Sequence, residues 1–139
     1  DEKYYQQALS FSEALQKKVW LKGGGYLVIE PTEAMTVIDV NSGKNTDKKA
    51  QREIILRSNT EAADEIARQL RLRNLSGMVM IDFINMADNR DVKLVMNALR
   101  KALSADPVKT ALIDITKLGI VEVTRMKVRK PLHEILCQR

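Results

Sequence analysis

The sequence predicts an α/β fold, a layered sandwich of helices around a mixed β-sheet. Short β-branched runs alternate with two long segments that have the apolar spacing of amphipathic helices. Hairpin patterns occur near both ends of the chain, which argues against a purely parallel, doubly wound sheet. The chain has 139 residues, 45% of them hydrophobic, which is enough for one domain with a substantial core.

The N-terminal third begins with a helical pattern and continues as a hairpin. Apolar residues recur at three- and four-residue spacing over residues 4–20, which predicts a helix. Gly23–Gly25 interrupts this pattern, and we interpret it as a flexible junction, because it lacks the phosphate-binding loop pattern. Strands are expected at residues 26–30 and 35–41, joined through residues 31–33 as an antiparallel hairpin.

The central third contains the longest helical pattern and the most apolar strand. A helix is expected over residues 49–73, with Asn59 on its apolar stripe and Asn74 just beyond its end. The run at residues 78–84 is apolar on both faces, which predicts a strand in the centre of the sheet. Asp88 can cap the next helix. The buried stripe of that helix is expected at Val92, Val95, Met96, Leu99 and Leu103.

The C-terminal third predicts a second hairpin. Its strands are expected at residues 111–116 and 120–127, joined by a turn at residues 117–119. Glu122 alternates with apolar residues in the second of these strands, and we expect it to face solvent. A short last helix is expected at residues 132–137.

Two of the expected strands carry an aspartate directly behind β-branched residues. These are Asp39 and Asp82, and Asn41 shares a strand face with Asp39. An acid placed there is costly to desolvate without a partner, so two of them suggest a shared cation if the strands are neighbours. Carboxylate and amide oxygens suit Mg²⁺ or Mn²⁺ better than Zn²⁺ and would support phosphodiester hydrolysis. The alternative is that each aspartate only caps the turn at the end of its strand.

The charge of the chain favours a polyanionic partner. The net charge is +5 and the isoelectric point is near 9.4, which fits nucleic acid or an anionic membrane surface. Arg125 and Lys127 share a strand face with a spacing that suits contacts to successive phosphates, although a solvated charged face is the competing interpretation. The other basic residues fall at the end of the long helix, where they complement its dipole, and around the last hairpin. They are Arg68, Arg71 and Arg73, and Lys117, Arg129 and Lys130.

Several classes of protein and chemistry find no support in the sequence. Cys137 is the only cysteine and His133 the only histidine, so an internal disulfide is impossible and no thiol or histidine catalytic motif is recognisable. No apolar run reaches the roughly 20 residues of a membrane span. We therefore expect a cytoplasmic protein. The ends of the sequence, without an initiator methionine or a signal peptide, lead us to expect a piece of a larger protein.

Longer motifs point to a known family. They are residues 24–29 (GGYLVI), 32–35 (TEAM), 38–42 (IDVNS), 59–75 (NTEAADEIARQLRLRNL), 81–84 (IDFI) and 118–125 (LGIVEVTR). Through these stretches the chain resembles the catalytic core of the ribonuclease E/G family. The run at residues 59–75 is the most specific of them, and the matches cover most of the chain from Leu21 onward.

The resemblance implies a fold, an activity and a set of site residues. It implies a deoxyribonuclease I-like catalytic subdomain at residues 23–139, preceded at residues 1–22 by the helical tail of a ribonuclease H-like subdomain. Such enzymes are Mg²⁺-dependent endoribonucleases that cut single-stranded, AU-rich RNA in rRNA processing and mRNA decay, and Mn²⁺ can substitute for Mg²⁺. By the resemblance, Asp39 and Asp82 bind the metal and Asn41 is the third catalytic residue.

The resemblance also bears on RNA contacts and on what this chain lacks. Lys109 matches a basic position near the RNA 5′-end and Lys117 a basic position in the last turn, and Asn85 stands where the family often has a second acid. The cysteine motif that joins protomers through Zn²⁺ is absent, as are the family's RNA-binding and 5′-sensing regions, so Cys137 is not assigned as a zinc ligand. We therefore expect a homo-oligomeric parent protein and weak or no activity from this chain alone.

Two other functions stay open at this point. The chain could be a non-catalytic RNA- or protein-binding module that uses its basic face, with the aspartates serving only structure. It could also be a metal nuclease that acts on DNA, which only the family resemblance argues against.

Overall fold

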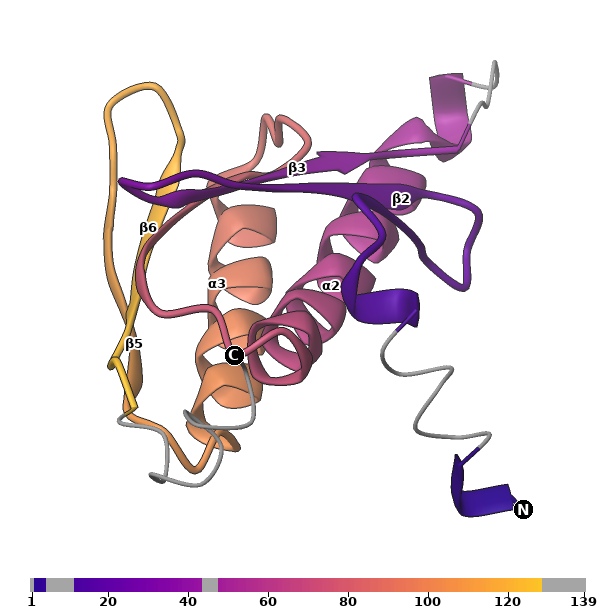
Figure 1. Ribbon diagram of the computed structural model, residues 1–139. Coiled ribbons are helices and arrows are strands. Elements are labelled where there is room, and N and C mark those ends of the chain that lie inside the picture. Colours follow the sequence, from indigo (N-terminus) through magenta and orange to yellow (C-terminus); the bar gives the residue numbers. More distant parts are fainter. Residues whose placement is uncertain (1, 5–11, 44–47, 129–139) are drawn as a thin grey trace.

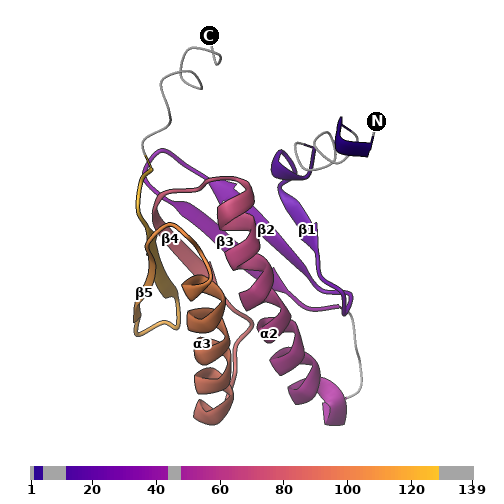
Figure 2. The same ribbon diagram turned by 90° about the horizontal axis from the view of Figure 1, so that it is seen from below.

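A computed structural model describes residues 2–4, 12–43 and 48–128 of the chain. They form a two-layer α/β sandwich in which two helices cover one face of a six-stranded sheet (Figures 1 and 2). The predicted fold class is confirmed. The strands are β1 (Lys18–Trp20), β2 (Tyr26–Pro31), β3 (Thr36–Asn41), β4 (Gly77–Asp82), β5 (Thr110–Ile115) and β6 (Val121–Arg125), and the helices are α2 (Lys48–Leu72) and α3 (Asn89–Ser104).

The sheet is mixed, with the strand order β1-β2-β3-β4-β6-β5. Only β3 and β4 are parallel, and α2 provides the long crossover that a parallel pair requires. The other neighbours pair in antiparallel fashion, as hairpin connections allow. The prediction that residues 78–84 form a central strand is confirmed for β4, which lies between β3 and β6.

The expected helix over residues 4–20 is wrong at its C-terminal end. Lys18–Trp20 form β1, which pairs with β2 so that Trp20 lies opposite Tyr26. Pairing with a neighbouring strand here overrides a local helical pattern. β1 thus belongs to the same sheet as β2–β6, while the predicted subdomain boundary after residue 22 stays a prediction.

The glycine triplet forms a defined turn rather than the flexible junction we expected. The Leu21 N–H donates a hydrogen bond to the Gly25 carbonyl at 2.8 Å, and Gly24 adopts a φ of +94°, which favours glycine. A Cβ atom at Gly25 would lie 2.6 Å from the carbonyl oxygen of Asn41. Glycine is therefore required where this turn packs against the end of β3.

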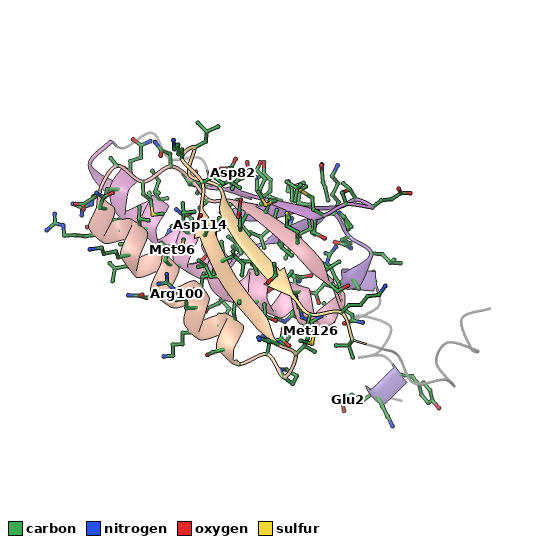
Figure 3. All side chains as sticks on the ribbon, turned by 90° about the vertical axis from the view of Figure 1, so that its left-hand side faces the viewer. Glu2, Asp82, Met96, Arg100, Asp114 and Met126 are labelled. Atoms are coloured by element: carbon green, nitrogen blue, oxygen red, sulfur yellow. The ribbon has the colours of Figure 1, made fainter. Side chains whose placement is uncertain are left out.

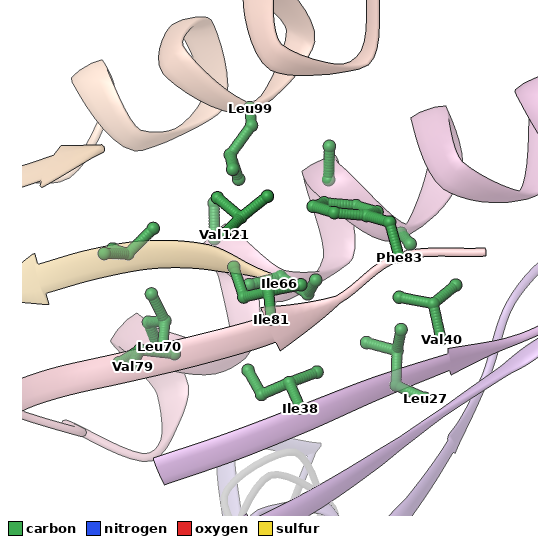
Figure 4. Packing of buried hydrophobic residues seen from close by; sticks show 14 of the residues in the cluster. Leu27, Ile38, Val40, Ile66, Leu70, Val79, Ile81, Phe83, Leu99 and Val121 are labelled. Atoms are coloured by element: carbon green, nitrogen blue, oxygen red, sulfur yellow. The ribbon is translucent and has the colours of Figure 1, made fainter. Parts of the chain in front are cut away.

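The core lies between the inner face of the sheet and the two helices (Figure 4). Ile38 and Ile81 from the central strands meet Ile66 and Leu70 of α2 and Leu99 of α3, and all five are fully buried. Truncating a side chain such as Leu99 to alanine costs about 2–5 kcal/mol in cores of this kind. The helices thus hold β3 and β4 rigidly from below and leave the opposite face of the sheet free.

The helix ends follow the sequence signals. Asp88 caps α3, and its side chain accepts a hydrogen bond from the Arg90 N–H at 2.8 Å. Asn74, with a φ of +49°, follows the end of α2. The expected last helix lies outside the described residues, together with Arg129, Lys130, His133 and Cys137.

Candidate active site

The two aspartates singled out by the sequence lie side by side. β3 and β4 are parallel neighbours, and Asp39 pairs in register with Asp82. Residues in register on adjacent strands point to the same face, and their backbones are about 4.8 Å apart. The sequence left open whether these strands are neighbours with aligned ends, and the structure shows that they are.

Both aspartates are exposed on the face of the sheet that the helices leave uncovered. Along β3 the side chains alternate, so that Ile38 and Val40 are buried while Asp39 is exposed. In β4, Ile81 is buried and Asp82 is exposed. The expectation of an acid desolvated behind β-branched residues is therefore wrong. The case for a cation now rests on the pairing of Asp39 with Asp82. Like charges directly opposite each other on neighbouring strands are destabilising, and a bound cation would neutralise that repulsion.

Asn41 completes a set of three oxygen-bearing side chains on this face. It is the last residue of β3, two positions beyond Asp39, and is half-buried. Its strand partner in β2 is Tyr26, and its carbonyl packs against Gly25. The glycine turn thus fixes the position of Asn41 beside the aspartate pair.

The chemistry of this donor set fits Mg²⁺. Among the described residues, no group of three or more His, Cys, Asp and Glu side chains is arranged to hold a metal. Two carboxylates and one amide oxygen remain, and Mg²⁺ is commonly held by one or two carboxylates while it keeps several waters. An exposed pair of this kind also leaves room for a phosphate oxygen.

A buried asparagine on α2 holds the segment that follows Asp82. The Asn59 side chain is fully buried, donates to the Ile84 carbonyl at 2.9 Å and accepts from the Ile84 N–H at 3.0 Å. The amide thus pairs with the backbone as a neighbouring strand would. Helical spacing places Asn59 on the apolar stripe of α2, and a polar residue in such a stripe is the sequence signal for this role.

An apolar hollow opens beside Asp82. It has a volume of about 310 Å³ and is lined by Phe83, Met96, Val121 and Leu118, among others. Leu118, in the β5–β6 turn, is 92% exposed and stands at its rim. The hollow places apolar surface next to the aspartate pair.

The predicted RNA-binding residues lie at two different ends of the sheet. Lys117 is exposed in the β5–β6 turn, at the same end as Asp82, because Ile81 pairs with Val121. Lys109 and Lys127 are exposed near the other end, roughly 17 Å away at about 3.3 Å per strand residue. Figure 3 shows the two ends, with Asp82 at one and Met126 at the other.

Arg125 does not serve as an exposed phosphate ligand in this structure. It is only 4% exposed, and its Nε lies 2.8 Å from Oδ2 of Asp106. The guanidinium also donates to Asn74 Oδ1 at 3.0 Å and to the Leu75 carbonyl at 3.1 Å. The face shared by Arg125 and Lys127 is therefore not a phosphate track, because Arg125 points into the fold.

The acids and arginines around the long helix also form structural contacts. Arg68 pairs with Glu13 at 2.6 Å and with Glu65 at 3.0 Å, and the bond from Arg68 lowers the pKa of Glu13. Arg73 donates to the Gln69 side chain at 2.8 Å.

Glu122 is half-buried on the open face of the sheet, opposite Met80.

Comparison with known proteins gives a consistent result. The chain matches the model of the Ribonuclease E/G family over residues 2–128. Ribonuclease E of Nostoc sp. is 47% identical over 132 residues, which cover 95% of this chain and 19% of that protein. Ribonuclease G of Escherichia coli is 46% identical over 124 residues, which cover 89% of this chain and 25% of that protein. The chain thus spans only about a fifth to a quarter of these curated relatives. In the described part of the chain, no helix has the length and apolar character of a membrane span.

Proposed function

This chain belongs to the ribonuclease E/G family, and on that premise we propose that it carries the catalytic centre of a Mg²⁺-dependent endoribonuclease. The substrate is single-stranded RNA, and the biological setting is RNA processing and decay in the cytoplasm. The observation that carries the proposal is the in-register pairing of Asp39 with Asp82 on an open sheet face. A structural role for both acids would not require them to share one face.

Each residue of the site has a distinct task. Asp39 and Asp82 would hold Mg²⁺, and Asn41 would orient the scissile phosphate or the attacking water. When bound, the ion would neutralise phosphate charge and lower the pKa of the attacking water. Asn59 is a positioning residue, because it holds the backbone at Ile84, two residues beyond Asp82. The products would carry a 5′-phosphate and a 3′-hydroxyl.

RNA binding by this chain alone should be weak. Of the predicted phosphate contacts, only Lys117 lies at the end of the sheet that carries the aspartates. Few phosphate contacts give weak binding that is lost as salt increases. Further contacts with RNA, and any assembly of protomers, would come from the parts of longer family members that lie outside the match to this chain.

The aspartate pair is tested by Asp39→Asn and Asp82→Asn in the longest natural form of the protein. Cleavage of a labelled single-stranded RNA in Mg²⁺ should fall about 100-fold or more in either variant, the scale seen when a group that stabilises the transition state is removed. Asp114→Asn is the matched control, because Asp114 is an exposed acid on β5 outside the pair. Cleavage at the parent rate in both site variants would leave a non-catalytic binding module as the function.

Two further measurements separate the remaining alternatives. Digestion of matched RNA and DNA oligomers distinguishes the endoribonuclease from a nuclease that acts on DNA. Titration of the unmodified protein with Mn²⁺, followed by electron paramagnetic resonance, should show an ion bound at Asp39 and Asp82. The Asp39→Asn variant should bind it at least tenfold more weakly, as loss of one of two carboxylate ligands implies.

A further inference from the structure

The outer surface of β1 and β2 carries an aromatic pair with a lysine over it. Trp20 is the only tryptophan of the chain and is 62% exposed. Its ring lies 5.4 Å from that of Tyr26, at an interplanar angle of 59°. Lys18 Nζ lies 4.2 Å from the Trp20 ring centroid and 4.1 Å from that of Tyr26. We call Lys18, Trp20 and Tyr26 the aromatic platform.

The exposure of Trp20 needs a reason, because tryptophan is usually well buried and dominates the packing where it occurs. Only 4% of this chain is aromatic, and the core is built from aliphatic residues. Val19 and Leu21, on either side of Trp20, are buried in that core. The fold thus uses the neighbours of Trp20 for stability and leaves its ring to solvent.

The platform is held rigidly. Trp20 and Tyr26 are paired in the β1–β2 ladder, and the Leu21–Gly25 hydrogen bond closes the turn between the strands. Lys18 stands two residues from Trp20 on the same strand face. A preorganised surface of this kind loses little conformational entropy when it binds a partner.

The platform is continuous with the candidate active site. Tyr26 pairs with Asn41, and Val28 pairs with Asp39, which pairs with Asp82. All of these side chains lie on the open face of the sheet. Tyr26 is therefore two strands across and two residues along from Asp82, about 12 Å at the usual strand spacing and rise per residue. That span equals roughly three to four bases at a rise of about 3.4 Å per stacked base.

The platform carries a cation on the open face of the sheet, and the hollow at its edge has mixed charge. Lys18 supplies a cation that can meet a phosphate beside the rings. Beyond the edge of the sheet, Trp20 borders a hollow of about 680 Å³ whose lining is of mixed charge, with the acids Glu61, Asp64 and Glu65 and the bases Lys22, Arg68 and Arg71. These charges balance, so the path of a bound strand toward Asp39 and Asp82 is inferred from the continuity of the strand pairing on the open face.

We propose that the aromatic platform is a stacking subsite for bases of the single-stranded RNA whose scissile phosphate lies at Asp39 and Asp82, roughly three to four nucleotides away. This inference rests on the proposed function for the identity of the strand. Stacking on Trp20 and Tyr26 tolerates any base, because every base has a π-face. Lys18 holds the adjacent phosphate.

The single tryptophan provides a direct test of binding. The unmodified chain is titrated, in EDTA to prevent cleavage, with a short single-stranded RNA while Trp20 fluorescence is followed. Stacking should quench the emission in proportion to binding. An abasic oligomer of the same length and charge should quench the emission little, because it has no bases to stack. Duplex RNA should also quench it little, because its bases are already stacked in the helix. No quenching by the intact RNA, or equal quenching by the abasic oligomer, would overturn the proposal.

Variants separate stacking from folding. Trp20→Ala should weaken RNA binding about 5- to 100-fold, measured by anisotropy of a labelled RNA, and Trp20→Phe should restore part of the loss. Lys18→Gln should lower the slope of binding against salt by about one phosphate contact. Leu94→Ala is the matched control, because Leu94 is an apolar side chain on α3 that is 55% exposed, and it should leave affinity unchanged.

The outcomes also distinguish this proposal from the proposed function. If Trp20→Ala leaves RNA affinity unchanged but alters self-association in sedimentation, the platform is a protein contact and the proposal is wrong. If quenching occurs while Asp39→Asn cleaves normally, the platform stands and the proposed catalytic function fails. If Asp39→Asn abolishes cleavage and RNA produces no quenching, the platform alone fails.

Discussion

The two ends of the central strands use charged residues in opposite ways. At one end, Asp39 and Asp82 stand side by side, exposed and with like charge. At the other, Arg125 and Asp106 form a buried ion pair whose side chains are 4% and 1% exposed, completed by hydrogen bonds to Asn74 and Leu75. The buried cluster has its hydrogen bonds satisfied and stabilises the fold. The exposed like-charged pair destabilises the fold, which indicates that it serves a function instead.

The largest effect of a single substitution on the free energy of unfolding is expected at the buried end. Arg125→Met leaves the Asp106 carboxylate buried without its partner, and we expect a loss of about 3–5 kcal/mol in the free energy of unfolding, measured by urea denaturation. The double variant Arg125→Met/Asp106→Leu should recover most of this loss. Stability equal to the parent in the single variant would contradict the structural role.

At the exposed end, the expected pattern is reversed. Asp82→Asn should reduce cleavage about 100-fold or more while the free energy of unfolding stays within about 0.5 kcal/mol of the parent or rises, because repulsion from Asp39 is relieved. The cleavage rate and the urea midpoint of Asp82→Asn, measured side by side with those of the parent, check the expected loss of activity and the expected stability. A large loss of stability would assign Asp82 to the fold instead.

Asn59 should affect both stability and cleavage, because it is buried and also holds the segment after Asp82. Asn59→Ala leaves the Ile84 N–H and carbonyl without their partner and should cost about 1–3 kcal/mol of stability. It should also lower the kcat of cleavage more than it changes KM. Asn97→Ala, at an exposed asparagine of α3, is the control and should change neither quantity. An effect on KM alone would contradict a positioning role.

Two carboxylates should set the acid sensitivity of the fold, Asp106 at the buried end and Asp88 at the start of α3. Burial raises the pKa of Asp106, but hydrogen bonds from Arg125, Val108 and Thr110 outweigh it and hold the pKa below its ordinary value. Hydrogen bonds from Arg90 lower the pKa of Asp88, the cap of α3, from 3.8 to about 2. Because both carboxylates bind protons more readily when unfolded, their contribution is complete above about pH 4 and is lost as the pH falls toward 2.

Urea midpoints measured between pH 6 and pH 2 test this acid dependence. Asp106→Asn should be less stable than the parent at pH 6, and the difference should shrink as the pH falls toward 2. A difference that stays constant with pH would show that the charge of Asp106 contributes nothing to stability.

The smallest effect is expected among the exposed lysines. Lys117→Gln should lower RNA affinity only about twofold to fivefold and reduce the salt slope by about one phosphate, because Lys117 lies at the aspartate end. Lys109→Gln, at the opposite end, should have no effect on binding near the site. Equal effects from both lysines would mean that RNA crosses the whole sheet.

Local patterns in the sequence were enough to predict most of the elements and to single out the candidate site residues. Alternation placed Asp39 and Asn41 on one face, and helical spacing predicted α2 and α3 to within a residue or two at most ends. The family motifs pointed to the same three residues. These features depend on neighbours in the chain, so they can be read without knowing the fold.

Tertiary structure alone decided which residues meet. The pairing of Asp39 with Asp82 spans 43 positions of sequence, and the exposure of both depends on which face the helices cover. Likewise, Lys18–Trp20 became a strand by pairing with β2, and Arg125 turned inward because Asp106 and the end of α2 surround it. Strand pairing and burial depend on contacts between segments distant in sequence, and periodicity along one segment carries no information about its partner.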